Sequence, residues 1–166
     1  MAAAISLDQL YSRPGFMLRR AHQIAVGIFV EECGAFGLTP PQHSALVILD
    51  ECPGIDQATL ARAIGFDRAT VGQVVRGLER RRLVKRVGCP TDRRRKVLDL
   101  TRAGRALMRR ASRAAARTSQ RLLAPLPTGE RRHFVALLLK LTNELNESSR
   151  YPVSPLSAHA RAANER

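Results

Sequence analysis

The chain contains 166 residues, which is enough for one domain with a substantial hydrophobic core. Its 28 basic and 14 acidic side chains give a formal net charge of +14, which favours a polyanionic partner over the alternative of a generally basic surface. No apolar run approaches the ~20 residues of a membrane span, and the N-terminal segment is too polar for a signal peptide. We therefore expect a soluble, cytoplasmic protein without a membrane partner.

The residues that usually carry metal or catalytic chemistry form no pattern. Cys33, Cys52 and Cys89 lie far apart without a CxxC pair, and the four histidines are equally scattered. This spacing argues against a disulfide framework and against a zinc site. The sequence also lacks H-E-x-x-H, G-x-x-x-x-G-K and a Ser/His/Asp order. We expect no catalytic residues, no metal and no cofactor, and hence no enzyme.

Helical periodicity dominates the first third of the chain. The first helix is expected from about residue 16 to residue 35, with one apolar stripe and a half-apolar opposite face that suggests a second contact. Gly37 is expected to end this region, and Thr39 with Pro40 to begin a second helix over residues 41–51.

The next segment shows a doubled helix-start pattern. Asp56 and Asp67 each resemble an N-cap, and each is flanked by a pair of apolar residues at the spacing of a hydrophobic staple. A glycine, Gly65, separates the two short helices that these caps begin. This arrangement is typical of a helix-turn-helix, whose second helix is expected from Arg68 to about Arg81.

The second of these helices has one apolar stripe and one polar face without acids. Gln and Arg can make bidentate contacts to base edges in a major groove, although an ordinary solvated face is the competing interpretation. The residues of the chain predicted to contact DNA from this helix are Arg68, Ala69, Thr70, Gln73 and Arg76.

Two β-prone segments, "LVKRVG" and "KVLDLT", flank the turn-forming "CPTD" and predict a two-stranded hairpin. Arg93, Arg94 and Arg95 then lie near its tip, where they are expected to contact DNA backbone and minor groove, with Asp92 supporting a neighbouring arginine. Residues 62–96 hold 12 basic and three acidic residues, a net charge of 12 − 3 = +9. Such charge provides affinity for phosphates that falls steeply with salt.

Two long helices are expected after the hairpin, one from Thr101 to about Leu123 and a leucine-rich one after "PLPTGE". The lobe formed by the helix-turn-helix and the hairpin is too small to bury the apolar stripe of either helix. We therefore expect these helices to pack against a second copy of the chain across a two-fold axis. The arginines on the first of these helices are interpreted as a solvated face rather than a second DNA site. The end of the chain, residues 150–166, is expected to be flexible.

The segment from "LTPPQHSALVIL" to "RRRKVLDLTRAG" resembles the winged helix-turn-helix of the MarR (multiple antibiotic resistance regulator) family. The wing pattern D-x-R is present as Asp92 and Arg94, followed by "LT" and a helix. The resemblance implies a mainly α fold with a two-stranded wing: residues 37–101 form the DNA-binding lobe, and residues 1–36 with 102–149 form a helical dimerisation region. Two positions depart from the family: Arg82 stands where glycine is usual, and Gln73 where a basic residue is usual.

The resemblance further implies a homodimer that binds a pseudo-palindromic operator in double-stranded DNA and responds to a small aromatic acid. The stretch "YSRPGFMLRRAHQI" is similar to the branch that controls breakdown of nicotinate-type and hydroxycinnamate-type compounds. The candidate effector-binding residues, which offer stacking surface, a carboxylate clamp and tunable hydrogen bonds, are Tyr11, Arg13, Phe16, His22 and His43. Interface roles for the two histidines and a subunit contact for Arg13 are the alternatives.

Two other functions compete with this hypothesis. A regulator of the same fold could sense oxidants through a cysteine near the start of the first helix. Here no cysteine precedes Cys33, which lies at the far end of that helix, and Cys89 on the hairpin is the other candidate. A winged helix could also serve only for protein contact, and binding to duplex DNA would distinguish it from a regulator.

Overall fold

The computed structural model of the chain describes residues 5–89 and 95–156. Helices make up most of this part, and the only sheet among the described residues is a two-stranded antiparallel hairpin. The elements in chain order are α1 (Leu7–Tyr11), α2 (Pro14–Cys33), η1 (Gly34–Phe36), α3 (Pro40–Glu51), α4 (Gln57–Ile64), α5 (Arg68–Arg80), β1 (Val84–Gly88), β2 (Lys96–Leu100), α6 (Arg102–Leu123), α7 (Thr128–Glu144) and η2 (Asn146–Ser148). The predicted mainly α fold with a two-stranded wing is confirmed.

The N-terminal region differs slightly from the expected single helix. A short helix, α1, comes first and begins with a capping box. The Ser6 hydroxyl accepts from the Gln9 backbone N–H, and the Gln9 side-chain oxygen accepts from the Ser6 backbone N–H. Pro14 then begins α2, because proline suits the first helical position, and α2 ends at Cys33. Gly37 adopts a left-handed conformation (φ 58°) at the end of η1, so its predicted stop role is confirmed.

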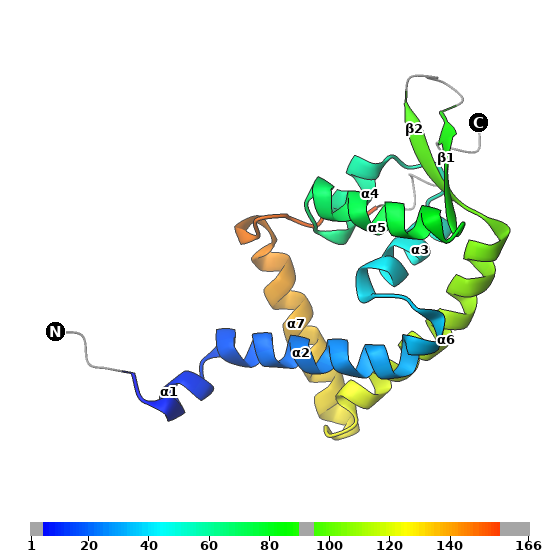
Figure 1. Cartoon of the computed structure of the whole chain (residues 1–166). Coiled ribbons are helices and arrows are strands. Elements are labelled where there is room, and N and C mark those ends of the chain that lie inside the picture. Colours follow the sequence, from blue (N-terminus) through cyan, green and yellow to red (C-terminus); the bar gives the residue numbers. More distant parts are fainter. Residues whose placement is uncertain (1–4, 90–94, 157–166) are drawn as a thin grey trace.

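One hydrophobic core holds together the lobe of residues 37–101, which the sequence predicts to bind DNA. Side chains from α3, α4, α5, β2 and α6 meet in it, among them Leu46, Leu60, Val75, Leu98 and Met108. A second, smaller cluster joins α2 to α6 through Phe29, Cys33 and Ala114. Helix α6 contributes to both clusters and therefore links the lobe to α2 (Figure 1).

Arginines of α6 also form ion pairs with two glutamates of α2, outside this small cluster. Arg117 Nε donates to Glu32 Oε2 at 2.7 Å, and Arg121 reaches both Glu31 and Glu32 at 2.7 and 2.9 Å. These hydrogen bonds hold the pKa of Glu32 below its ordinary value. The sequence predicted a solvated arginine face here, whereas part of that face is used for ion pairs to a helix 85 residues away in the chain.

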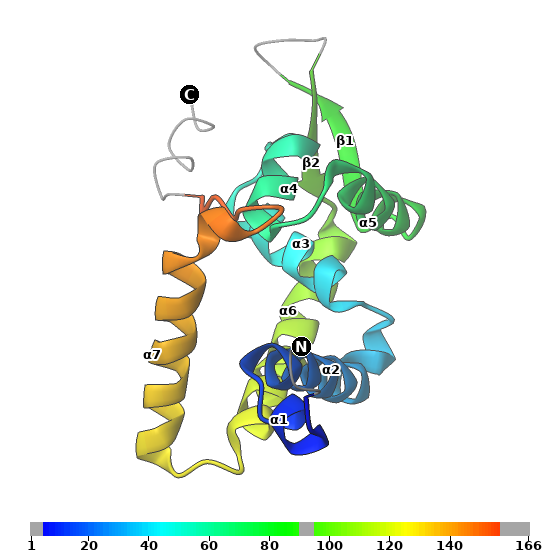
Figure 2. The same cartoon turned by 90° about the vertical axis from the view of Figure 1, so that its left-hand side faces the viewer.

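Helix α7 stands apart from α2 and α6 and joins α6 through a loop at its base (Figure 2). Its large apolar side chains are exposed in the protomer: Phe134, Val135, Leu137, Leu139, Leu141 and Leu145. The N-terminal half of α2 likewise exposes Met17, Leu18 and Ile24. Such extensive exposed apolar surface on helices is typical of an interface.

Candidate DNA-binding surface and effector region

Two aspartates begin the two helices of the helix-turn-helix. Asp56 Oδ1 accepts from the Thr59 backbone N–H at 2.8 Å, and Asp67 Oδ1 accepts from the Thr70 N–H at the same distance. Both predicted N-caps are confirmed. Gly65 ends α4 in a left-handed conformation (φ 75°), which glycine adopts without steric cost, and this turn sets the angle between α4 and α5.

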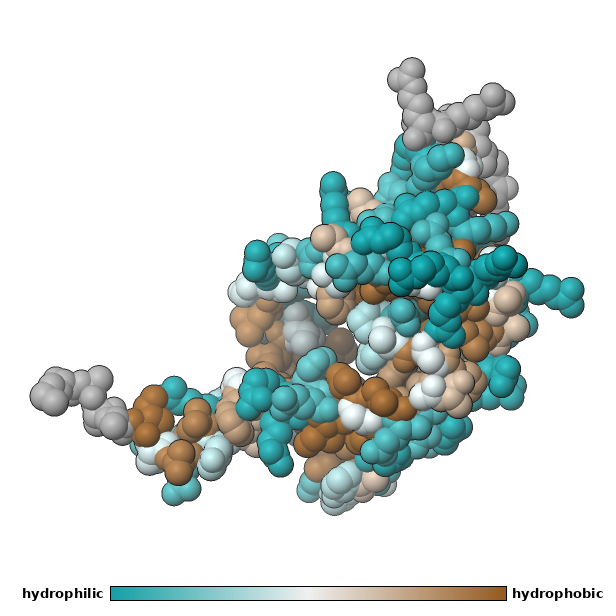
Figure 3. All heavy atoms as spheres, viewed as in Figure 1, coloured by the Kyte–Doolittle hydropathy of each residue, from teal (hydrophilic) through white to brown (hydrophobic). Residues whose placement is uncertain are grey.

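Helix α5 separates its buried and exposed residues cleanly. Its buried side consists of Val71, Gly72, Val75 and Leu78, which pack in the lobe core or against α4. The exposed side presents Arg68, Ala69, Gln73, Arg76 and Arg80. The upper surface over α5 and the wing is correspondingly hydrophilic (Figure 3). Thr70 is half-buried and donates its hydroxyl to Asp67 Oδ2 at 2.6 Å, so this side chain already has a structural role.

A polar brace that the sequence did not reveal connects α4, α5 and the wing. Gln57 Nε2 donates to the Arg68 carbonyl at 3.1 Å, and Gln57 Oε1 accepts from Arg86 Nη2 at 2.9 Å. Arg86 Nε in turn donates to Glu79 Oε1 at 3.0 Å. Arg86 therefore links β1 to both ends of α5, directly at Glu79 and through Gln57 at Arg68. A polar residue that follows an N-cap is too common a pattern for sequence to identify this role.

The wing is attached to the lobe at its base. Strands β1 and β2 pair from Val84 with Leu100 to Gly88 with Lys96, and Ile55 adds an isolated bridge to Leu98. Arg95 Nη2 lies 2.9 Å from Asp56 Oδ2, so this predicted DNA contact also pairs with the N-cap of α4. Asp92, Arg93 and Arg94 lie outside the described residues, and their predicted roles stay predictions.

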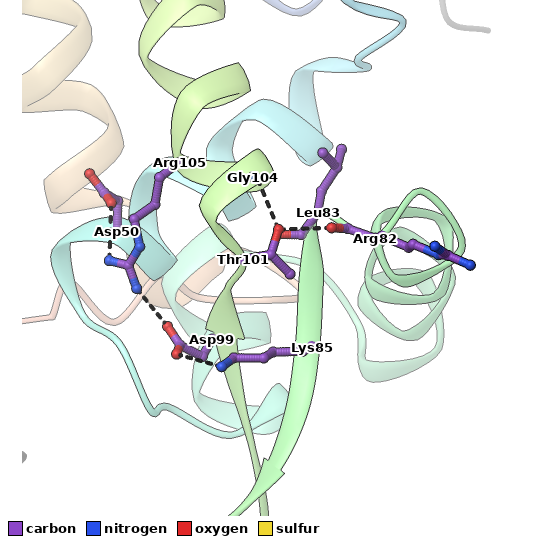
Figure 4. Close-up of polar contacts among 8 residues, drawn as sticks. All are labelled: Asp50, Arg82, Leu83, Lys85, Asp99, Thr101, Gly104 and Arg105. Atoms are coloured by element: carbon purple, nitrogen blue, oxygen red, sulfur yellow. Dashed lines mark hydrogen bonds and ion pairs between the residues drawn. The ribbon is translucent and has the colours of Figure 1, made fainter.

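A second polar cluster joins the wing to α6 (Figure 4). Arg105 of α6 pairs with Asp99 of β2 at 3.0 Å and with Asp50 of α3 at 3.8 Å. Thr101 caps α6 by accepting from the Gly104 N–H at 3.0 Å, and its hydroxyl donates to the Arg82 carbonyl at 2.8 Å. These contacts tie the wing to both α3 and α6.

The predicted effector residues fall into two groups at opposite ends of α2. Tyr11 and Phe16 lie with their ring centroids 5.3 Å apart at its N-terminal end, and the Arg19 guanidinium lies 4.9 Å from the Phe16 centroid. Arg13, the N-cap residue of α2, is exposed beside them. Together these side chains present aromatic faces and positive charge to solvent.

His43 lies at the other end of α2, where the lobe meets α6. Its Nε2 is 3.3 Å from Ser112 Oγ, and its ring meets Phe29 edge-on at 5.8 Å between centroids. Burial lowers the pKa of His43, so this imidazole is neutral at pH 7. His43 also borders an open cavity of about 400 Å³; its lining residues are His43, Ser44, Val47, Ile48, Ala63 and Ile64.

One protomer does not bring these two groups together. Phe16 and Phe29 are thirteen residues apart on α2, which corresponds to roughly 20 Å along a helix axis. His22 lies between them and is exposed. Because His22 precedes Phe29 by seven residues, the two share a helix face about 10 Å apart along the axis. Only His43 among the predicted effector residues borders the cavity at the lobe.

The cysteines differ in access. Cys33 is fully buried between α2 and α6, and burial raises the pKa of its thiol, which disfavours the reactive thiolate. Cys89 is half-buried at the end of β1, where its backbone N–H donates to the Arg95 carbonyl at 3.0 Å. The described residues contain no cluster of three potential metal ligands, and none of their helices is long and apolar enough to span a membrane.

Known proteins share this arrangement. The signature of the MarR family matches residues 36–95, which include the helix-turn-helix and β1 and end just before β2. The putative transcriptional regulatory protein for the hcr operon of Thauera aromatica is 34% identical over 135 residues, covering 81% of each chain.

Two solved structures are also similar. The transcriptional repressor CouR bound to a 23-mer DNA duplex has a TM-score of 0.77 and 31% identity, with 84% of this chain and 99% of that chain covered. BpsR of Bordetella bronchiseptica, whose DNA binding is regulated by 6-hydroxynicotinic acid, has a TM-score of 0.75 and 32% identity over 80% of this chain and 94% of its own. With its capped helix-turn-helix, wing and flanking helices, the chain belongs to the MarR family of winged-helix transcriptional regulators.

Proposed function

We propose that this protein is a transcriptional repressor that binds a pseudo-palindromic operator as a homodimer and is released by a small aromatic carboxylate. The observation that carries the DNA-binding part is the exposed face of α5, where Arg68, Gln73 and Arg76 project from a helix whose opposite side is fixed in the core. The brace from Gln57 through Arg86 holds this helix at a set angle to the wing. A wing beside a rigid helix suits simultaneous contact with a minor and a major groove.

The homodimer is supported by apolar surface that the protomer leaves exposed. Helix α7 carries an apolar face formed by Phe134, Leu137, Leu138 and Leu141. In water such a helix face needs a partner. A two-fold arrangement through α2, α6 and α7 would present two copies of α5 to half-sites about 34 Å apart, one turn of the double helix.

Salt-dependent DNA binding tests this part of the proposal. Fragments recovered from a genome-wide pull-down with the full-length protein would identify the operator, and fluorescence anisotropy would measure the dissociation constant between 50 and 200 mM salt, the range over which phosphate contacts weaken strongly. We expect steep weakening with salt. A triple variant, Arg93→Gln, Arg94→Gln and Arg95→Gln, should lose most of the affinity at moderate salt; retained affinity would contradict the proposed wing contact, and no duplex binding at all would favour a protein-contact role.

The effector part is supported by the chemistry of the two groups at the ends of α2, the second of which is His43 on α3, and by the family relatives. Tyr11 and Phe16 offer stacking surfaces, and Arg13 offers a cation for a carboxylate. Neutral His43 borders a cavity large enough for one aromatic ring with a carboxylate. In a homodimer, the N-terminal end of α2 from one protomer can reach the His43 cavity of its partner, so both groups would contact one ligand.

A ligand panel tests the effector. Nicotinate, 4-hydroxybenzoate and 4-hydroxycinnamate would be titrated while thermal stability and operator affinity are measured. A ligand that releases the repressor must stabilise the protein and weaken DNA binding, because it binds the DNA-free state more tightly. Arg13→Gln should reduce both effects, whereas Arg20→Gln, an exposed neighbour on α2, serves as the matched control. If no acid changes either quantity, the effector assignment fails while DNA binding stands.

A further inference from the structure

The segment that follows η2 lies against the helix-turn-helix. Residues 150–156, here named the C-terminal strap, run from the end of α7 to α4 (Figure 2). The Ser154 N–H donates to the Arg62 carbonyl at 3.0 Å. Val153 exchanges two hydrogen bonds with the Asn146 side chain at 2.9 and 3.1 Å, so the middle of the strap is anchored both to α4 and to η2.

The strap packs closely on the turn of the motif. A Cβ atom added to Gly65 would come within 2.7 Å of Val153 Cγ2 and 3.4 Å of the Tyr151 carbonyl oxygen. Gly65 therefore serves two purposes: its left-handed backbone ends α4, and its missing side chain admits the strap. Docking of this segment is a specific contact of the fold, and the part of the predicted tail beyond residue 156 lies outside the described residues.

A cleft of about 470 Å³ lies between the strap, α4 and the N-terminus of α5. Three arginines on three different elements line it: Arg62 on α4, Arg68 on α5 and Arg150 on the strap. The Arg150 guanidinium lies 5.5 Å from the centroid of the Tyr151 ring, which restricts its position. The cleft thus collects cations that are far apart in the sequence.

These charges have little compensation within the protomer. Among the described residues, no ion pair joins Arg62, Arg68 or Arg150 to a carboxylate. Asp67 also lines the cleft, but one carboxylate against three guanidinium groups leaves a net charge of 3 − 1 = +2. The N-terminus of the 13-residue α5 adds its partial positive charge at the same place. An anion would relieve the repulsion between the three guanidinium groups.

We propose that this cleft binds a phosphate of the DNA backbone beside the major groove that α5 enters. DNA fits better than a free small anion because Arg68 belongs to both the cleft and the exposed face of α5, so the cleft adjoins the face proposed to meet DNA. Arg62 and Arg150 become DNA-contacting residues, and the strap becomes part of the DNA-binding surface. This inference rests on the proposed function, since it requires that α5 meets DNA.

The test measures the salt dependence of DNA binding for the full-length protein and its Arg150→Gln variant, on the operator and on an unrelated duplex of equal length. Each lost phosphate contact lowers the slope of log affinity against log salt by about 0.9, so a dimer should lose about 2 in slope. The weakening should be similar on both duplexes, because phosphates carry no sequence information. Arg132→Gln, which removes the same charge from exposed α7, should leave the slope unchanged.

Two further variants separate a phosphate contact from a structural effect. Arg150→Lys keeps the charge and should keep the slope, and Arg62→Gln should lower it as Arg150→Gln does. An unchanged slope in Arg150→Gln, with steep wild-type dependence, would overturn the cleft assignment while DNA binding stands. Absence of wild-type DNA binding would instead overturn the proposed function. Stabilisation by millimolar benzoate that Arg150→Gln abolishes, with the slope unchanged, would show a small-ligand site and also overturn the proposal.

Discussion

Arg82 occupies a backbone conformation that usually belongs to glycine. Its φ of 56° is positive, and among the described residues it is the only non-glycine residue with a positive φ. The conformation turns the chain from α5 into β1, and the Arg82 carbonyl accepts from the Thr101 hydroxyl. A Cβ atom in this region approaches the following carbonyl oxygen, at a cost of about 1 kcal/mol. The departure from the family pattern therefore carries strain at this corner.

Replacing Arg82 with glycine should relieve that strain. We expect Arg82→Gly to raise the free energy of unfolding by up to about 0.5 kcal/mol, after the greater unfolded-state entropy of glycine is included. Arg82→Ala removes the same charge but keeps the Cβ, so it should bring no such gain. Urea denaturation followed by circular dichroism would compare the three proteins, and equal stability of the two variants would contradict the strain.

Gly104 is required by a close backbone approach. A Cβ atom at this position would collide with the Leu83 carbonyl oxygen, because the first turn of α6 rests on the chain that enters β1. Gly104→Ala should therefore lower the free energy of unfolding by about 1–3 kcal/mol, the usual cost of overpacking. Gly129→Ala, where a Cβ would meet nothing within 4 Å, should have little effect in the same denaturation experiment. Similar stability of both variants would argue against the close approach.

At the scale of elements, Asp56 joins two of them. Its Oδ1 caps α4, and its Oδ2 pairs with Arg95, the residue just before β2. The backbone hydrogen bond from Thr59, with the Thr59 hydroxyl and Arg95 as further causes, lowers the pKa of Asp56 below its ordinary 3.8. Asp67 has a lowered pKa for a related reason, since the Thr70 hydroxyl and N–H both donate to it. The charged carboxylates are thus part of the folded motif.

These shifts predict acid sensitivity. A group whose pKa is lower in the folded protein adds stability that is fully present above its unfolded value and is lost as pH falls through the folded value. Wild-type stability should therefore decline below about pH 4, in the range set by unfolded aspartate. Asp56→Asn keeps a cap acceptor but cannot ionise, so its decline should be shallower. Thermal unfolding from pH 7 to pH 3 checks this, and parallel curves would contradict it.

Two variants at Asp56 distinguish its role as an N-cap from its ion pair with Arg95. Asp56→Ala removes the cap acceptor as well as the partner of Arg95, and loss of an N-cap costs about 1 kcal/mol. Asp56→Asn retains the cap and loses only an exposed ion pair, which is worth little at a surface. At pH 7 we expect Asp56→Ala to be clearly less stable than Asp56→Asn in urea denaturation. Equal destabilisation would assign the main role to the ion pair.

At the scale of the whole molecule, the protomer leaves much apolar surface exposed on two of its helices. Its lobe has a closed core, yet α7 and the N-terminal half of α2 leave apolar side chains in water (Figure 3). Leu137 and Leu141 of α7 are 52% and 42% exposed, which is unfavourable for an isolated chain. Burying these faces in a homodimer would also fix the distance between the two copies of α5.

A charge on this face should separate the dimer without unfolding the lobe. Leu141→Glu would place a carboxylate in the predicted interface, where burial of an unpaired charge is costly. Lys140→Glu, a more exposed neighbour on α7 with a larger change of charge, is the matched control. Sedimentation velocity should show a monomer for Leu141→Glu and a dimer for wild type and the control. A dimeric Leu141→Glu protein would exclude α7 from the interface.

Local features of the fold were predictable because local sequence produces them. Asp56 and Asp67 as caps and Gly65 as the corner depend on interactions within a few residues, and the two wing strands are close neighbours in the chain. The brace of Gln57, Arg86 and Glu79 was missed, because hydrogen bonds across 29 residues leave no local pattern. The effector residues were only partly brought together: sequence proximity grouped Tyr11, Arg13 and Phe16, but helix length placed them far from His43.

The sequence by itself determined the helix-turn-helix, the wing, the excess positive charge and the membership of a DNA-binding family, since capping, periodicity and charge are properties of neighbouring residues. Only the tertiary structure decided which cations are already paired and which remain available. Arg95, Arg117 and Arg121 pair with carboxylates, whereas Arg62, Arg68 and Arg150 converge from three elements on one cleft. Convergence of like charges from distant segments is a consequence of packing, and no local pattern records it.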